Sequence, residues 1–300
     1  MRKAFTLLEL VVTITITGII AGSTFQMFMN IYKSYNDIYI MNSLDSKLTN
    51  VSMQILKYLE NRVLGSLVDS NSSGHFIISK TKMNKERNQT LEWIEKAFDT
   101  YSGTWNNNLN IIQPNWSGFL DLTKEHNKTI LFLDDGNISQ AEKIIYLISD
   151  KSINIFDSQK DFSAIFFKGG ITNSIDCFSW ETAKSNCGFV GYFDKNGSEY
   201  NFLSSNQTKG FEPKYIYEQF ALSWTAYGLK VEDRNLSIYY NYRPWNGENI
   251  QNGTKITLLE NISKFEYKSN GATVSLEICI ESVSNNPNDT VEFCRKNIIY

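Results

Sequence analysis

The sequence predicts an α+β fold in which one long N-terminal helix packs on a mainly antiparallel β-sheet domain. The first observation is an apolar run over residues 5–29 that continues into an amphipathic pattern over residues 30–64. The second is that residues 65–300 contain short runs rich in Val, Ile, Tyr and Phe, separated by polar turn sequences. Aromatic residues make up 14% of the chain and only four prolines occur, which is the composition of a folded protein. We therefore expect one globular domain, residues 65–300, carried on a helix.

The apolar run is long enough to cross a membrane. About 25 residues at roughly 1.5 Å each exceed the ~30 Å hydrocarbon core of a bilayer. A secretory signal peptide would have a shorter apolar stretch and no internal acidic residue, so we predict a retained transmembrane helix. Arg2 and Lys3 precede the run, and positive charges favour the cytoplasmic side. The N-terminus is therefore expected in the cytoplasm and the globular domain outside it.

Glu9 is the one acidic residue inside this run. A carboxylate at the centre of a bilayer costs about 2.5–3.5 kcal/mol on insertion scales, and such residues are usually functional and paired. A plain membrane anchor does not account for it. We therefore treat Glu9 as a candidate functional residue that needs a partner.

The outer half of the helix, residues 30–64, is predicted to be amphipathic. Its apolar residues recur at steps of three and four, at Leu44, Leu48, Val51, Ile55, Leu59 and Val63. Polar residues fill the positions between them, and Gly65 is a natural stop. One helix of roughly 60 residues should thus run from the membrane into the domain and form the spine on which the domain packs.

The domain begins with a predicted helix and continues mainly as strands. The helix is expected at residues 85–99, and strands at residues 129–133, 143–149, 153–156, 163–167 and 188–193. The sequence DDGN at residues 134–137 predicts a hairpin turn. In the C-terminal third, the turns EDRN, SNG and NNPND separate long alternating runs, which predicts antiparallel hairpins.

The four cysteines fall into two local pairs. They are Cys177, Cys187, Cys279 and Cys294, with no CxxC element, and only two histidines occur in the chain, so a zinc site is not expected. Two local disulfides, Cys177–Cys187 and Cys279–Cys294, fit an exported domain. The alternative is four free buried thiols.

The sequence contains no recognisable catalytic constellation. GxSxG, HExxH and P-loop motifs are absent, and His75 and His126 lie far apart in the sequence. Asp134 and Asp135 could ligate calcium, but the following Gly-Asn favours a turn. We therefore expect a protein that is not an enzyme and holds no metal or cofactor. The net charge of −3 gives no sign of nucleic-acid binding.

The stretch KAFTLLEL at residues 3–10 resembles the processing site of type IV pilins and of type II secretion pseudopilins. The resemblance implies that a prepilin peptidase removes residues 1–4 as a leader peptide, cutting between Ala4 and Phe5, and that Phe5 is then N-methylated. Glu9 becomes the fifth residue of the mature chain. Its implied partner is the charged amine of Phe5 on a neighbouring subunit, which would neutralise the carboxylate and set the stagger between subunits. The family usually has glycine where this chain has Ala4.

Two weaker features agree with packing between subunits. Gly18 and Gly22 lie four residues apart, a spacing that allows membrane helices to approach closely, although ordinary glycine usage explains it as well. The C-terminal run that begins LLENISKFEYK is similar to the corresponding region of J-type minor pseudopilins, with Ile262 and Phe265 at the apolar positions of its strand. That pattern is degenerate.

The resemblances imply a minor pseudopilin or pilin-like structural subunit at or near the tip of a type II secretion pseudopilus. A minor pilin of a type IV or competence pilus is the alternative, and a membrane-tethered periplasmic adhesin or enzyme is a more distant one. The implied partners are a prepilin peptidase, other major and minor pseudopilins or pilins, and an inner-membrane assembly platform, but not nucleic acid. The implied location is the bacterial inner membrane, crossed once, with a periplasmic domain, and the assembled pseudopilus after processing.

Six Asn-x-Ser/Thr sequons each carry an acidic residue two positions before the asparagine. They are at Asn71, Asn88, Asn127, Asn137, Asn196 and Asn235. The pattern resembles the extended acceptor sequence of some bacterial periplasmic oligosaccharyltransferases, and most of these sequons are expected in exposed turns. The alternative is an asparagine-rich sequence that forms sequons by chance.

Overall fold

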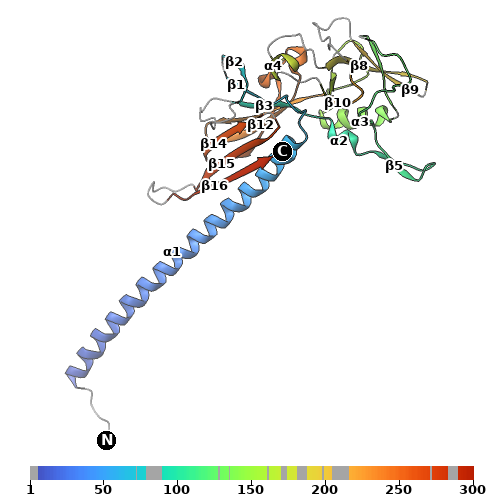
Figure 1. Cartoon of the computed structure of the whole chain (residues 1–300). Helices are drawn as coiled ribbons and strands as arrows, with labels where there is room; N and C mark the ends of the chain where they lie inside the picture. The colour runs from blue at the N-terminus through green and yellow to red at the C-terminus, as the bar shows by residue number, and fades with distance from the viewer. Residues whose placement is uncertain are drawn as a thin grey trace.

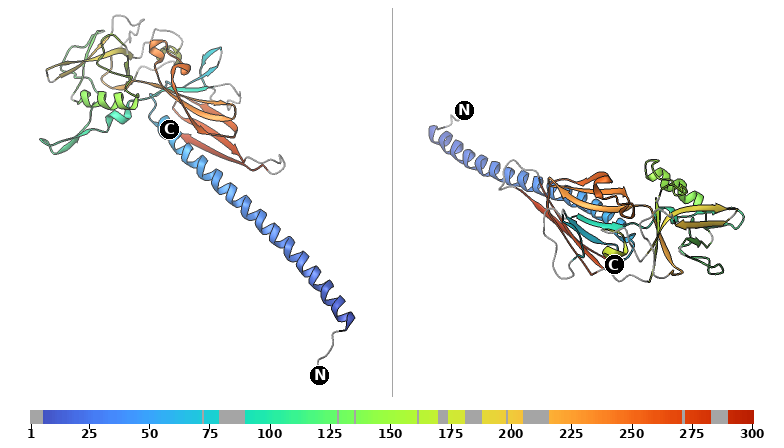
Figure 2. Two further views of the ribbon diagram at one scale, coloured as in Figure 1. Left: turned by 180° about the vertical axis from the view of Figure 1, so that it is seen from behind. Right: turned by 90° about the horizontal axis from the view of Figure 1, so that it is seen from above.

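A single long helix, α1 (Leu7–Glu60), runs from the N-terminus into the folded domain (Figure 1). Its 54 residues correspond to about 80 Å at 1.5 Å per residue. The N-terminal half extends away from the domain in every view (Figure 2). The structure, a computed structural model, describes residues 6–71, 73–78, 90–127, 129–134, 136–160, 162–169, 174–180, 188–197, 199–204, 216–270, 272–282 and 290–300. The predicted α+β arrangement of a spine helix on antiparallel sheets is confirmed.

The helix ends earlier than the sequence predicts, at Glu60 rather than at residue 64. Beyond it, the backbone N–H of Val63 donates to the carbonyl of Ile94 at 2.8 Å, so the chain has already joined the neighbouring strand. Gly65 has φ +85°, a left-handed conformation that glycine adopts without strain, and it turns the chain out of the spine. Pairing with the strand that contains Ile94 therefore replaces the last helical turn that the sequence predicts.

The spine packs against two sheets of the described chain. The larger has the strand order β13-β12-β11-β3-β1-β2 and is antiparallel throughout. Its strands are β1 (Val68–Asn71), β2 (Gly74–Phe76), β3 (Thr90–Ile94), β11 (Ala226–Glu232), β12 (Asn235–Tyr242) and β13 (Thr254–Leu259). The β11–β12 turn is the predicted EDRN, and its central residues Asp233 and Arg234 both have positive φ, as in the turns that suit two-residue hairpins.

The smaller sheet holds the C-terminus and lies beside the upper part of α1 (Figure 1). Its order is β14 (Ile262–Ser269), β15 (Val274–Glu281) and β16 (Glu292–Ile299), all antiparallel, as predicted. Leu48, Ile55 and Leu59 of the helix are fully buried in one core that these two sheets share. Arg295 of β16 also donates to the Thr49 hydroxyl, which ties the last strand to the helix. The amphipathic stripe that the sequence shows is thus the buried face of the spine.

A further sheet packs against the six-stranded one through a second core, which contains Ile94 and Ala226 of the six-stranded sheet and Phe166 and Val190 of the further one. It has the order β10-β7-β8-β9-β6, with β6 (Ile130–Phe132), β7 (Ser163–Phe167), β8 (Gly188–Asn196), β9 (Glu199–Ser204) and β10 (Phe220–Ser223). The helix α3 (Ile138–Ile148) packs on this sheet through Ile138, Ala141 and Ile145. A two-stranded hairpin, two short α-helices and two 3₁₀ turns complete the described elements: β4 (Thr104–Asn106), β5 (Ile111–Gln113), α2 (Phe98–Tyr101), α4 (Ser174–Cys177), η1 (Pro244–Asn246) and η2 (Ile250–Asn252).

Several predictions of local structure in the domain are wrong. The strand predicted at residues 143–149 is the end of α3, whose Asn137 caps the helix by accepting from the backbone N–H of Gln140. The same cap overturns the hairpin turn predicted at residues 134–137. The segment predicted to be helical at 85–99 contains strand β3, while residues 85–89 lie outside the described part. Residues 153–156 form a turn and not a strand.

Glu95 lies where the end of the spine meets the six-stranded sheet. Glu95 is 8% exposed, and its carboxylate accepts a hydrogen bond of 3.1 Å from the indole N–H of Trp93. Burial raises the pKa of this carboxyl well above its usual 4.5, and the negative charge of Asp99 adds to the rise, although the Trp93 hydrogen bond opposes it. The charged form of Glu95 therefore destabilises the folded state.

Replacing Glu95 with glutamine should raise the free energy of unfolding, increasingly so as the pH rises above about 4.5. A carboxyl with a raised pKa favours folding fully below the pKa of the unfolded chain and loses that contribution as the pH rises through the folded pKa. Glutamine keeps an oxygen for the Trp93 hydrogen bond and has no charge to bury. Thermal unfolding of the full chain in detergent at pH 4, 6 and 8 measures the difference, and equal gains at all three values would contradict the assignment.

Candidate assembly site at the N-terminus

Glu9 lies in the first turn of α1 and is bound to the start of its own helix. Its carboxylate oxygen Oε2 accepts from the backbone N–H and from the hydroxyl of Thr6, both at 3.1 Å. The backbone N–H of Glu9 donates in return to the Thr6 hydroxyl at 3.3 Å. This is a capping box, which satisfies N–H groups that a helix start leaves unpaired. The negative carboxylate also faces the positive end of the helix dipole.

Thr6 is a site residue that the sequence analysis missed. The signal was present, because Thr6-Leu-Leu-Glu9 has the S/T-x-x-E spacing of a capping box directly before an apolar run. Thr6, the second residue after the predicted cleavage point, holds the carboxylate of Glu9, the fifth, at the N-terminal end of the helix.

The helix surface around Glu9 is uncovered in the single chain. Leu7 is 81% exposed and Leu8 is 73% exposed, and the remaining large apolar residues of the membrane segment are exposed as well. Within the described residues, Glu9 forms no ion pair. Both the apolar surface and the carboxylate therefore have interactions to gain from another molecule. Among the described helices, α1 alone is long and apolar enough to cross a membrane.

The serine and threonine hydroxyls of residues 13–24 are satisfied within the helix. The hydroxyls of Thr13, Thr15, Thr17, Ser23 and Thr24 each donate to a backbone carbonyl three or four residues earlier, at 2.6–3.0 Å. Such bonds let threonine and serine lie in an apolar environment at little cost. Glu9 is thus the one charged residue in residues 6–29, and within the described residues it has no oppositely charged partner.

The predicted glycine pair is open to a neighbour. A Cβ atom added at Gly18 or at Gly22 would meet no other atom within 4 Å, so neither glycine is required by contacts within the chain. Whether they serve helix packing remains a prediction. Ala4 and Phe5, the predicted processing residues, lie outside the described residues.

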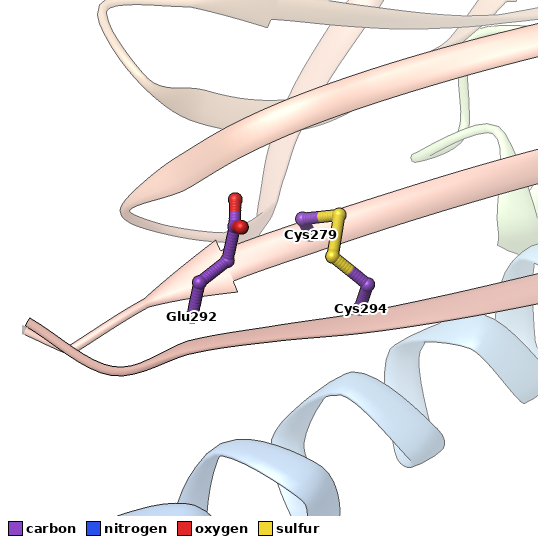
Figure 3. A group of neighbouring side chains, drawn as sticks. All are labelled: Cys279, Glu292 and Cys294. Carbon is purple, nitrogen blue, oxygen red and sulfur yellow. A yellow bond between two sulfur atoms is a disulfide. The ribbon is translucent and has the colours of Figure 1, made fainter.

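The C-terminal disulfide is confirmed. Cys279 and Cys294 are directly opposed on β15 and β16 and are bonded to each other (Figure 3). Cys177 is also disulfide-bonded, while its predicted partner Cys187 lies outside the described residues. The expectation of free thiols therefore does not hold for these three cysteines.

The side chain of Glu292 lies beside the C-terminal disulfide and completes a group of three potential metal ligands (Figure 3). The two sulfur atoms are joined in a disulfide, so neither is the thiolate that a metal requires. Glu292 itself accepts from the Ser263 hydroxyl at 2.6 Å. This arrangement does not suit a metal site.

The candidate glycosylation sites are placed unequally. Asn127, Asn137 and Asn196 are exposed, Asn71 and Asn235 are half-buried, and Asn88 lies outside the described residues. All five described asparagines lie at the end of a helix or strand or in a loop. Asn137 caps α3, and Asn71 accepts from the backbone N–H of Ser73 at 2.7 Å.

Comparison with known proteins finds a match to the N-terminal segment that contains Glu9. Residues 1–25 match the family model described as the prokaryotic N-terminal methylation motif. No curated protein matches the chain, and no solved structure matches it. The J-type resemblance of the C-terminal strands is thus outside the matched part, although Ile262 is buried and Phe265 packs against the same core. The chain carries a prepilin-type N-terminus and is type IV pilin-like over residues 1–25, the segment that the match covers.

Proposed function

We propose that this protein is a minor pseudopilin, a structural subunit that assembles at or near the tip of a type II secretion pseudopilus. It acts by packing and not by catalysis. The observation that carries the proposal is the combination of the methylation motif at residues 1–25 with a 54-residue helix whose membrane half is uncovered. A helix of this kind needs lipid around it before assembly and other helices around it afterwards.

Glu9 supplies the register of that assembly. After removal of residues 1–4, the new amine of Phe5 carries a positive charge at the start of the helix. The amine of a neighbouring subunit can approach Glu9, because the residues beside it are exposed and no described group of its own chain pairs with its charge. A charge pair in an apolar bundle contributes only when both members are present, so it favours one stagger between subunits over others.

The assignment to a tip subunit of a secretion system rests on the C-terminal resemblance. The strands β14 to β16 form a sheet of their own that packs on the spine, and their run LLENISKFEYK is similar to the end of J-type pseudopilins. The location follows from the anchor. Arg2 and Lys3 before the membrane segment favour a cytoplasmic N-terminus in the inner membrane, and the Cys279–Cys294 disulfide suits an oxidising periplasm.

Co-expression with a prepilin peptidase tests the first step. N-terminal sequencing and intact mass should show loss of Met1 to Ala4 and one added methyl group on Phe5. The variant Ala4→Arg should remain uncut because a bulky charged side chain does not fit a site for a small residue, while Ala4→Gly should be cut at least as well as the wild type. Retention of Met1 in the wild-type protein would contradict the proposal.

A further inference from the structure

The distribution of acidic residues around the sequons is not random. Twelve Asn-x-Ser/Thr sequons occur in the chain, and six have Asp or Glu two positions before the asparagine. With 32 acidic residues among 300, roughly one position in nine is acidic, so chance would place an acid before about one of the twelve. The positions immediately before and after the asparagine each hold an acid in one sequon of twelve. The remaining six sequons are Asn50, Asn115, Asn206, Asn252, Asn261 and Asn288.

From this pattern and the surface geometry we propose that Asn127 and Asn196 are N-glycosylated by an oligosaccharyltransferase that reads the carboxylate two residues earlier. The enzyme would recognise that carboxylate with a cationic side chain, since charge-assisted bonds to carboxylates are strong and directional. The inference is independent of the proposed function and concerns a modification of the same exported domain.

Asn127 has the geometry of an accessible acceptor. Asn127, Glu125 and Thr129 are all exposed. The amide oxygen of Asn127 accepts from the Thr129 backbone at 2.8 Å, the Thr129 hydroxyl at 2.6 Å and the Ile130 backbone at 3.0 Å. The amide nitrogen, which would carry the sugar, makes no hydrogen bond within the described residues, so modification breaks none.

Asn196 is the last residue of β8, beside the turn into β9. Strands β8 and β9 lie in a part of the domain remote from the spine (Figure 1). Asp194 and Asn196 are both exposed, and Gly197 has φ +66°, as in tight hairpin turns. A glycan there would project into solvent and not into the membrane or the buried face of the spine. The two sites thus share an exposed acid and an exposed asparagine.

Burial prevents glycosylation at two other sequons that have an acidic residue at the same spacing. At Asn71, the preceding Asp69 is 5% exposed and accepts from the Tyr267 hydroxyl at 2.8 Å, so a transferase cannot reach its carboxylate. At Asn235, the third residue of the sequon is Ser237, which is fully buried. Sequons with the same sequence pattern therefore differ in their accessibility to the transferase in the folded protein.

The reaction is a glycosyl transfer from a polyprenyl diphosphate-linked oligosaccharide. The lone pair of the Asn127 amide nitrogen forms a bond to the anomeric carbon, and the bond from that carbon to the phosphate oxygen breaks. The polyprenyl diphosphate leaves with the electron pair of that bond, and the amide nitrogen releases one proton to the medium. No oxidant or reductant is needed.

Glycopeptide mass spectrometry of the full chain, purified from its native host in detergent, tests the proposal. Oligosaccharide should be found on Asn127 and Asn196 and not on Asn71, Asn235 or Asn252. Asn252 is the matched control, because it is an exposed sequon asparagine with Ile250 in place of the acid. Bare peptides at both proposed sites, or equal occupancy at Asn252, would overturn the inference.

The variant Glu125→Gln separates charge recognition from simple exposure. It should lower the occupancy of Asn127 at least about tenfold while leaving Asn196 unchanged, because the amide keeps the size of the side chain and removes only its charge. Unchanged occupancy of Asn127 would overturn the role of the carboxylate. Modification of Asn71 and Asn235 to the level of Asn127 would overturn selection by the folded surface.

Discussion

Replacing Glu9 with glutamine is expected to leave the protein cleaved and inserted in the membrane but to remove about nine-tenths or more of it from assembled filaments. The amide keeps the size and the accepting oxygen of the side chain and loses the negative charge. The amine of a neighbouring Phe5 would then be buried without a counter-charge. Bonds to charged groups contribute about 1.5–3 kcal/mol each, and about 1.4 kcal/mol changes an equilibrium tenfold.

The measurement is the fraction of the protein that sediments with sheared filaments from cells that carry the whole assembly machine. Glu60→Gln is the matched control, since Glu60 is an exposed glutamate at the opposite end of the same helix. It should assemble like the wild type. Wild-type assembly of Glu9→Gln would show that the carboxylate does not set the subunit contact.

The capping box explains how Glu9 is tolerated before assembly. In the single chain, its carboxylate already accepts two hydrogen bonds from Thr6 and lies at the positive end of the helix. It is therefore not a bare charge in the bilayer, whose cost the insertion scales describe. In the proposed assembly, a neighbouring amine would meet a carboxylate that is already held in place at the helix start, so less side-chain freedom would be lost on pairing.

The large features of the fold could be predicted from the sequence because each has a strong local signal. The spine helix combines an apolar run with a stripe at three- and four-residue steps, and the structure buries Leu48, Ile55 and Leu59 from that stripe. The C-terminal runs alternate apolar and polar residues in the sequence and are separated by turn residues, which predicts hairpins. The pairing of β15 with β16 places Cys279 opposite Cys294. Both patterns can be recognised in the local sequence alone, without the rest of the chain.

The middle of the domain could not be predicted because its patterns are ambiguous. The run KIIYLIS is rich in β-branched residues but belongs to α3, where Ile138, Ala141 and Ile145 face the core at helical spacing. The segment around β3 places Leu91, Ile94 and Phe98 at helical spacing, which predicts a helix, but all five residues of β3 are buried in a sheet. Tertiary packing decides whether a short apolar run of this kind forms a helix or a strand.

The candidate site was only partly predictable for a different reason. The charge of Glu9 inside an apolar run identifies it, but the partner that we propose for it belongs to another molecule and is absent from the contacts of one chain. The role of Thr6 has a sequence signal in its spacing from Glu9, which the structure makes visible as two reciprocal bonds. The sites of modification needed the structure, because Asn127 and Asn235 differ in the burial of their surroundings and not in their motif.

Replacing Ile55 with alanine is expected to cause a large loss of stability. Ile55 is fully buried in the core that α1 shares with the six-stranded and the C-terminal sheets. Removing a buried aliphatic side chain down to alanine costs about 2–5 kcal/mol, because the site loses its contacts and keeps a cavity. For a domain of this size, the loss should lower the melting temperature by about 5–15 °C in circular dichroism of the full chain in detergent.

Met53→Ala is the control on the same helix, because Met53 is 60% exposed and outside the shared core. It should change the melting temperature by no more than about 2 °C, since surface substitutions stay within about 0.5 kcal/mol. If both variants melt alike, the domain does not depend on the spine for its core. If only Ile55→Ala melts early, the outer half of α1 is an integral part of the domain, because the core that it shares with the two sheets then depends on the spine.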